Sequence, residues 1–161
     1  AAIPVTLVIA VMAAVLIAPQ QRARTDAERK DDLRQVAAIV SQNEERGDAV
    51  LYQPWGTRVA GLAYPRPFAR LANVGLAAAP IASATLTGVP ATPAGLARRL
   101  RAAGPTIRRI WLVRWRRRLP PTPLVTEQLA LLRGLRLIRT WDVKSIQLKL
   151  YAAAPRTGGP A

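Results

Sequence analysis

The first eighteen residues constrain this chain more than any other feature, because none of them is charged. Residues 1–18 are a run of Ile, Val, Leu, Met and Ala that only Pro4 and Thr6 interrupt, and a polar stretch containing Arg22 ends it. A helix needs about 20 apolar residues to cross the hydrocarbon core of a bilayer, within a range of ~17–25. Length and flanks together predict a transmembrane helix over residues 1–19.

Two alternatives compete with a membrane span. A secretory signal peptide carries a basic region before a short apolar core of ~7–15 residues, whereas here the apolar run reaches the first residue. A buried helix of a soluble domain normally has a polar face, which residues 1–18 lack. The missing initiator Met and the open apolar start favour a chain cut from a longer protein, with residues 1–19 as its last span.

The charged residues are distributed unevenly along the chain. Residues 1–48 hold 6 basic and 7 acidic side chains, whereas residues 49–161 hold 18 basic and 2 acidic ones, which together give the net charge of +15. A surface this basic attracts anions, so phosphate on nucleic acid or on lipid head groups is the expected partner. GC-rich coding is the alternative source of the charge, since 21 of the 24 basic residues are Arg.

The composition excludes several kinds of active site. The chain has no cysteine and no histidine, which rules out disulfides, Cys/His zinc sites and His-dependent catalytic triads. Its sequence also lacks the glycine-rich phosphate-binding motifs and the G-x-S-x-G motif of hydrolases. We therefore predict no catalytic residue and no cofactor site on this chain.

One group of carboxylates precedes the expected soluble domain. Glu28, Asp31 and Asp32 include a pair, Glu28 and Asp32, that would share one helical face and offer oxygen ligands to a metal. Acidic side chains are also common in the first turn of a helix, where the helix dipole favours them. We prefer this second interpretation and predict no metal site. Residues 46–48 spell the cell-adhesion tripeptide Arg-Gly-Asp, which we interpret as a helix end that leads into a strand.

A helix-capping pattern follows the apolar segment. Thr25 and Glu28 have the spacing of a capping box, so the first helix should begin near Asp26 and end at Gly47. Its apolar face repeats at helical spacing over Leu33, Val36, Ala37 and Val40. Three further helices are expected over residues 57–64, 92–104 and 122–133, the last two opened by Thr-Pro pairs.

The expected strands are short and hydrophobic. They cover residues 49–52, 73–78, 107–115, 135–141 and 145–152. The last two form an antiparallel hairpin, in which Ile146, Leu148 and Leu150 alternate with polar neighbours. Helices that alternate with strands predict an α/β fold for residues 20–153, a three-layer α/β sandwich with a mostly parallel sheet and this hairpin at its edge. Residues 154–161 form a Pro/Gly tail that we expect to be disordered.

The most distinctive local pattern is Arg114-Trp115-Arg116-Arg117-Arg118, which follows the clearest strand. In open α/β sheets, ligands bind at the carboxyl ends of the strands. Four arginines and a tryptophan can hold phosphates, stack on a base or lie at a lipid interface. We predict contact with anionic membrane lipid, because a membrane helix would hold the domain within reach of head groups. An exposed strand end with solvated charges is the alternative.

A series of short motifs stands in a characteristic order over residues 1–153. The motifs are Pro19-Gln20-Gln21-Arg22 after the apolar span, Arg29-Lys30-Asp31-Asp32-Leu33-Arg34, Gly47-Asp48-Ala49-Val50-Leu51-Tyr52, Arg58 ahead of Leu62-Ala63-Tyr64-Pro65, Ile110-Trp111-Leu112-Val113, and Leu148-Lys149-Leu150-Tyr151. This order resembles the carboxyl-terminal region of actinobacterial membrane glycosyltransferases of family 39, the mannosyltransferase-like group. Two segments depart from the family pattern: Arg114–Arg118 is more basic, and Lys144-Ser145 stands where a glycine turn is usual.

The resemblance implies a polytopic membrane enzyme that transfers a sugar from a polyprenyl-phosphate donor on the outer side of the membrane. The catalytic Asp of that family lies in the first extracytoplasmic loop, upstream of this chain, so no catalytic residue is carried over. The resemblance also places the soluble domain at the cell membrane, outside the cytoplasm. Arg22 and Arg24 favour the opposite orientation by the positive-inside rule, and we follow the resemblance.

Two functional hypotheses follow from the sequence. The chain is either the accessory, non-catalytic C-terminal fragment of a membrane glycosyltransferase, or a single-span protein whose basic domain binds anionic lipid, nucleic acid or a protein partner. The first hypothesis requires further apolar spans upstream of Ala1. The second predicts binding to nucleic acid that weakens steeply with salt.

Overall fold

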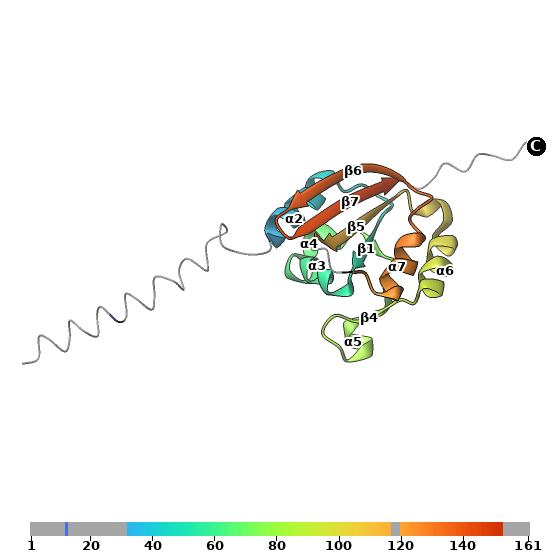
Figure 1. Ribbon diagram of the computed structural model, residues 1–161, viewed down its shortest axis with the longest axis horizontal. Coiled ribbons are helices and arrows are strands. Elements are labelled where there is room, and N and C mark those ends of the chain that lie inside the picture. The colour runs from blue at the N-terminus through green and yellow to red at the C-terminus, as the bar shows by residue number, and fades with distance from the viewer. Residues whose placement is uncertain (1–11, 13–31, 117–119, 153–161) are drawn as a thin grey trace, which may run out of the picture.

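The computed structural model describes Met12 and residues 32–116 and 120–152 of the chain. Helices and strands alternate along these residues (Figure 1). In chain order the elements are α2 (Leu33–Asn43), β1 (Asp48–Gln53), η1 (Trp55–Arg58), α3 (Val59–Ala63), α4 (Pro65–Phe68), β2 (Ala72–Asn73), β3 (Leu76–Ala78), α5 (Pro80–Ser83), β4 (Val89–Pro90), α6 (Pro93–Ala103), η2 (Gly104–Thr106), β5 (Arg109–Trp115), α7 (Pro123–Ala130), β6 (Arg136–Val143) and β7 (Ile146–Ala152).

Five strands form the main sheet in the order β2-β1-β5-β7-β6. β1 is parallel to β2 and β5, whereas β7 is antiparallel to both of its neighbours, β5 and β6. Val143 at the end of β6 lies opposite Ile146 at the start of β7, so Lys144 and Ser145 form the turn of an edge hairpin. The mixed sheet with a C-terminal antiparallel hairpin confirms the prediction. β3 and β4 form a separate antiparallel pair.

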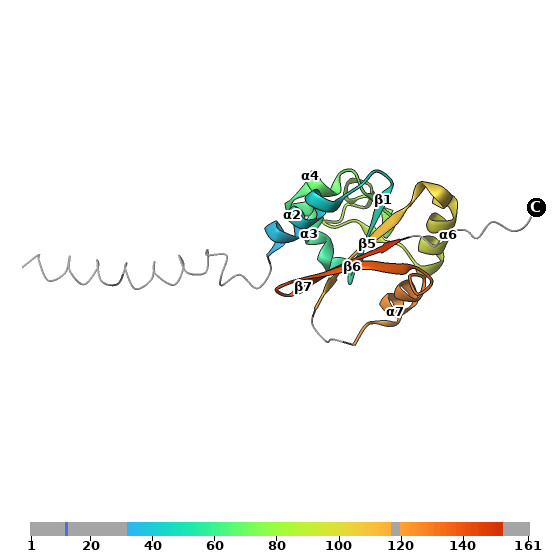
Figure 2. The same cartoon turned by 90° about the horizontal axis from the view of Figure 1, so that it is seen from above.

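Helices cover both faces of the main sheet (Figure 2). Val50 and Tyr52 of β1 belong to one buried cluster, together with residues of α2, α3 and α4. Ala49 and Leu51 belong to a second cluster, which includes Leu96 of α6 and, partly buried, a leucine of α7. Because successive residues of a strand point to opposite faces, the sheet lies between two hydrophobic layers. This arrangement confirms the predicted three layers.

The predicted transmembrane helix over residues 1–19 lies outside the described residues, apart from Met12. Within the described parts of the chain, none of the helices is both long and apolar enough to cross a bilayer. The predicted tail over residues 154–161 also lies outside the described residues. The membrane span and the tail therefore stay predictions.

The first described helix begins later than predicted. Asp32 is the N-cap of α2, and its carboxylate accepts a hydrogen bond from the backbone N–H of Gln35 at 2.9 Å. The predicted start near Asp26 is therefore wrong for this helix, since Asp32 has a non-helical backbone and takes the capping role. Thr25 and Glu28 lie outside the described residues. The predicted apolar face is buried at Val36, Ala37 and Val40.

The segment between β1 and α6 is more broken than the sequence predicts. The single strand expected over residues 73–78 is two strands, β2 in the main sheet and β3 in the separate pair. Gly75 separates them, and a Cβ there would lie only 2.9 Å from Leu51 Cδ1, so the chain passes close to the core at this glycine. The loop expected over residues 80–92 contains α5 and β4. The helix α4, which two prolines open, was not predicted.

Three local predictions are confirmed in detail. The Thr92 hydroxyl accepts the backbone N–H of Gly95 at 3.1 Å and caps α6, while Thr122 caps α7 by accepting the N–H of Val125 at 3.4 Å. Prolines occupy the first turn of both helices. The inward residues of β7 are buried at Ile146, Leu148 and Leu150. The two Thr-Pro pairs thus set the starts of α6 and α7.

Candidate functional site

The predicted basic run lies at the carboxyl end of the central strand β5. Arg114 and Trp115 are the last two residues of β5 and are half-buried, and Arg116 follows with an exposed side chain. The backbone N–H of Arg116 donates to the Ser145 carbonyl at 2.6 Å, so the run passes beside the β6–β7 turn. Arg117 and Arg118 lie outside the described residues.

The pleat of β5 divides this run between two faces of the sheet. Arg114 lies opposite Gln53 of β1 and Gln147 of β7 in the strand register. Trp115 is the next residue and so points to the other face, where it packs against the core cluster under α2. The two side chains therefore lie on opposite faces of the sheet, and Trp115 packs against the core. Arg114 and Arg116 remain candidates for anion contact.

Polar side chains gather where the parallel strands β1 and β5 end. The hydroxyl of Thr57, which is buried, donates to the Val113 carbonyl at 2.9 Å and so joins η1 to β5. Gln53 at the end of β1 donates to the side chain of Gln128 from α7. Gln128 in turn donates to the Ala91 carbonyl just before α6. This buried chain of hydrogen bonds fastens helices of the second face to the carboxyl end of the sheet.

Arg58 is the last residue of η1, the short helix that follows β1. Its guanidinium carbon lies 5.2 Å from the centre of the Trp55 ring. Its Nη1 atom is buried and has no hydrogen-bond partner among the described residues. Burial lowers the pKa of Arg58, and the neighbouring Tyr52 opposes that effect. The buried Oδ1 atom of Asn73, at the end of β2, is likewise without a partner in the described part of the chain.

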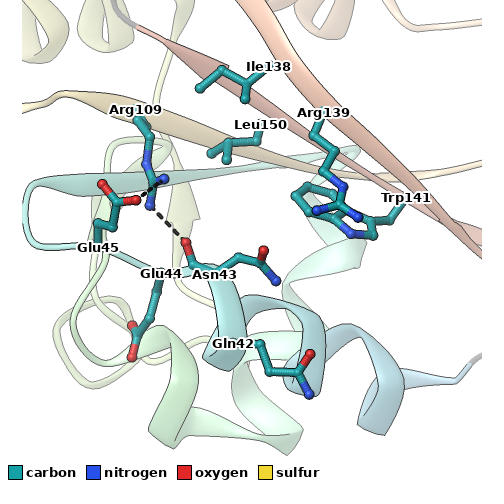
Figure 3. Close-up of a pocket in the computed structure, with 9 residues that line it drawn as sticks. All are labelled: Gln42, Asn43, Glu44, Glu45, Arg109, Ile138, Arg139, Trp141 and Leu150. Carbon is teal, nitrogen blue, oxygen red and sulfur yellow. Dashed lines mark hydrogen bonds and ion pairs between the residues drawn. The ribbon is translucent and has the colours of Figure 1, made fainter.

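A shallow depression lies at the opposite, amino end of the strands (Figure 3). Its volume is about 330 Å³. It is lined by Gln42, Asn43, Glu44, Glu45, Arg109, Ile138, Arg139, Trp141 and Leu150. No local sequence pattern marks this depression, because most of its residues come from α2, β5 and the C-terminal hairpin, which are far apart in the chain.

Several hydrogen bonds at the depression meet at Arg109. Arg109 donates to both carboxylate oxygens of Asp48, at 2.8 Å each. It also donates to Glu45 at 2.6 Å and to the Asn43 carbonyl at 2.8 Å (Figure 3). The hydrogen bond to Asp48 is the largest cause that raises the pKa of Arg109. The Trp141 ring stacks on that of Trp111, with 5.3 Å between the ring centres. We interpret this end as a structural clamp.

The two ends of the sheet differ in how their partly buried arginines are paired. At the amino end, Asp48 and Glu45 neutralise Arg109. At the carboxyl end, Arg58 keeps an unused buried N–H donor, and the exposed Arg116 and Lys144 lie at adjoining positions. Among residues 32–116 and 120–152, no group of three acidic side chains is placed to hold a metal ion. We therefore take the carboxyl end as the candidate site, where the side chains of Arg58, Arg114 and Arg116 offer donors that suit an anion.

Comparison with known proteins gave no relative: no protein-family model, no curated protein and no solved structure matches this chain. The resemblance to family 39 glycosyltransferases therefore stays a prediction from the sequence. The positions of Arg114 and Arg116 relative to α2 supply the structural support for a function.

Proposed function

We propose that this chain is the C-terminal, accessory part of a polytopic membrane glycosyltransferase that uses a polyprenyl-phosphate sugar donor. We further propose that its α/β domain contacts anionic lipid phosphate with the carboxyl end of the sheet. One observation carries the second proposal: α2, which leads out of the apolar N-terminal segment, begins at the same end of the sheet as Arg114 and Arg116. The domain would then meet the membrane with this basic end.

The position of α2 follows from its short connection to β1. Only residues 44–47 separate the end of α2 from the start of β1, so the helix runs antiparallel to the strand. At 1.5 Å per residue, the helix is about 16 Å long, and six residues of strand span about 20 Å. The first residue of α2, Leu33, therefore lies level with the carboxyl ends of β1 and β5. Figures 1 and 2 both show the start of α2 on the same side as the β6–β7 turn.

Core contacts support the same placement. Leu33 and Trp115 pack against one buried cluster, which also contains Val143 and Ile146 on either side of the hairpin turn. The start of α2, the end of β5 and the hairpin turn thus border the same buried cluster on one face of the sheet. Residues 19–31 link the apolar segment to Asp32, and thirteen residues reach at most about 45 Å. This linker joins the domain at the start of α2, which supports the proposal that the basic end faces the membrane.

Electrostatics favour an anionic partner at this end. Each Lys or Arg near an anionic membrane surface contributes about 1 kcal/mol of attraction. Arg114, Arg116 and Lys144 are the described basic residues at the end of β5 and in the adjoining turn. Three such charges would give a tethered domain a preference for anionic over neutral lipid. The same three charges would bind a free polyanion only weakly. Lipid therefore fits this site better than nucleic acid.

The lipid contact can be tested with the full chain in nanodiscs. The chain has no cysteine, so a single fluorophore can be attached at Ser145→Cys in the hairpin turn or at Ala102→Cys, near the end of α6 and the amino end of the sheet. With a quencher on the lipid head groups, we expect stronger quenching at position 145 than at 102. We also expect a larger signal in anionic than in neutral nanodiscs.

Two double variants test whether the lipid contact depends on specific arginines or only on the total charge of the chain. Arg114→Gln with Arg116→Gln should remove the preference of the position-145 signal for anionic lipid. Arg101→Gln with Arg133→Gln, at exposed positions near the other end of the sheet, should leave it unchanged. Equal quenching in neutral and anionic nanodiscs, or an equal loss in both double variants, would overturn the lipid proposal.

The identity of the parent protein has its own test. If the proposal is correct, the reading frame upstream of Ala1 encodes several further apolar spans and an acidic residue in an early loop. A start codon directly before Ala1, with no such spans, would contradict the glycosyltransferase proposal. In that case the single-span alternative predicts retention of the chain on a phosphate polymer at low salt, weakening steeply as salt rises.

A further inference from the structure

A small arm stands clear of the body of the domain (Figure 1). We define the arm as residues 76–90, which comprise β3, α5 and β4. Its base is fixed by β-pairing of Leu76 with Pro90 and of Ala78 with Val89. The indole N–H of Trp55 also donates to the Gly88 carbonyl at 3.2 Å. The base of the arm is therefore held by strand pairing and by a side-chain hydrogen bond, and the arm follows the carboxyl end of β2.

The tip of the arm exposes two large aliphatic side chains. Ile81 in α5 is 96% exposed and Leu86 beyond it is 90% exposed. Between them, the Ser83 hydroxyl donates to the Ala79 carbonyl at 2.9 Å and lies 2.8 Å from the Thr85 hydroxyl. The tip thus satisfies its own hydroxyl groups locally. It presents the aliphatic groups outward, where water solvates them poorly.

Charge is missing from this part of a strongly charged chain. One residue in five is charged across the whole sequence, yet residues 71–97 contain no Asp, Glu, Lys or Arg. Arg70 and Arg98 flank the uncharged stretch. An uncharged tip with exposed aliphatic side chains can enter a lipid phase without desolvating an ion.

Two cations stand at the base of the arm. The Nη2 atom of Arg99 donates to the Ala77 carbonyl of β3 at 3.3 Å. Arg58 Nη1 lies 2.8 Å from the position that a Cβ on Gly88 would take. In each arginine the Nη1 atom is buried and has no hydrogen-bond partner among the described residues. We call this pair, Arg58 and Arg99, the collar.

We propose that the arm inserts Ile81 and Leu86 into the boundary between head groups and acyl chains of an anionic bilayer, with the collar at the level of the lipid phosphates. An aliphatic tip above basic residues is the pattern of an interfacial anchor. The inference rests on the proposed function, which holds the domain against a membrane. A convex tip of two side chains offers little surface to a protein partner, whereas the collar complements lipid phosphate.

The experiment uses the full chain with one environment-sensitive fluorophore at Ala82→Cys in the tip, reconstituted in anionic vesicles. We expect a blue-shifted emission and quenching by lipids that carry a quencher high on the acyl chain. Ile81→Ser with Leu86→Ser should abolish both effects. Leu124→Ser with Leu137→Ser, which also removes two exposed leucines but on α7 and β6, should preserve them. The substituted side chains are all exposed, and circular dichroism checks that every variant is folded.

The reporter at position 145 distinguishes this inference from the proposed function. Quenching at 145 together with water-like emission at 82 would overturn the arm proposal and leave the lipid contact of the basic end intact. Equal emission at 82 in the Ile81/Leu86 variant and in the unsubstituted tip would also overturn it. If dilution of the protein in the vesicles removes the blue shift, the tip contacts a second copy of the chain, and the bilayer proposal is wrong.

Discussion

Asp48 and Arg109 form a two-point ion pair between the first residues of two neighbouring parallel strands. Arg109 Nε lies 2.8 Å from Oδ1 and Nη2 lies 2.8 Å from Oδ2. Asp48 is only 2% exposed, and its Oδ2 atom also accepts the indole N–H of Trp111 at 2.8 Å. Because Arg109 also donates a hydrogen bond to the Asn43 carbonyl, the pair connects the end of α2 with the first residues of β1 and β5.

Loss of the Asp48 carboxylate should destabilise the domain strongly. In Asp48→Ala, the Arg109 guanidinium and the Trp111 indole lose their buried acceptor, which typically costs about 3–5 kcal/mol. Glu45→Ala is the matched control, because that carboxylate also pairs with Arg109 but its side chain is 68% exposed. Surface pairs of this kind contribute about 0–1 kcal/mol. Urea unfolding of the full chain in detergent micelles measures both, and similar losses in the two variants would contradict the role of Asp48.

We expect the buried phenol of Tyr52 to make the folded domain less stable at alkaline pH. Burial raises the pKa of the Tyr52 phenol above its ordinary value, and Arg58 partly opposes this effect. Above about pH 10 the unfolded chain releases the phenol proton while the folded chain retains it. The free energy of unfolding should therefore fall as pH rises above 10, by up to about 1.4 kcal/mol per pH unit for this group. Below pH 10 both states are protonated and the full contribution remains.

The Tyr52→Phe variant isolates that group. The ring contacts with Trp55 and Phe68 are retained, but the titrating proton is gone. Unfolding free energies measured between pH 10 and 11 should decline less steeply in the variant than in the unsubstituted chain. Parallel declines would show that other groups govern the alkaline transition.

Substitution of Gly47 should destabilise the domain, although this glycine lies in a partly exposed turn. Its φ is +93°, and an added Cβ would lie 2.8 Å from the Thr106 carbonyl oxygen. Gly47→Ala is therefore expected to lower the free energy of unfolding by about 1–3 kcal/mol. At Gly56 in η1, no described atom lies within 4 Å of an added Cβ, so Gly56→Ala should be neutral or stabilising by about 0.4–1 kcal/mol. Thermal unfolding compares the two, and equal effects would contradict this difference.

The side chains of Gln53 and Gln128 should behave as a coupled pair. Gln128→Leu leaves the Gln53 amide and the Ala91 carbonyl without their buried partner, at a cost of about 1–3 kcal/mol per group. Adding Gln53→Leu removes one of the two orphaned groups. The double variant should thus lose less stability than the sum of the single variants, and simple additivity in urea unfolding would refute the coupling.

The elements that could be predicted from the sequence are those with local causes. Thr92 and Thr122 precede prolines and cap their helices as expected, because an N-cap depends only on the next three residues. The alternation of Ile146 and Leu148 with polar neighbours likewise fixed the inward face of β7. Asp32 shows the limit of this approach, because several polar residues could cap α2 and sequence spacing alone favoured another.

The candidate sites depend on contacts that local patterns do not encode. Asp48 and Arg109 are separated by 61 positions and meet only because β1 and β5 are neighbours in register. Gly75 lies between β2 and β3, where an added Cβ would meet the Leu51 side chain, and no spacing in the sequence reveals this contact. The separation of Arg114 from Trp115 was accessible, however, since a strand always places successive side chains on opposite faces.

The attachment of α2 has a mechanical consequence. The helix is joined in sequence to the central strand β1, yet it holds to the sheet mainly through one apolar face of three buried residues. β1, in contrast, pairs with β5 over its whole length, Asp48–Gln53, and with β2 at Ala49 and Val50. Tension applied from the N-terminal side would peel α2 away turn by turn, whereas extraction of β1 requires the simultaneous shearing of two ladders. The helix would thus yield first under load and shield the sheet from forces transmitted along the chain.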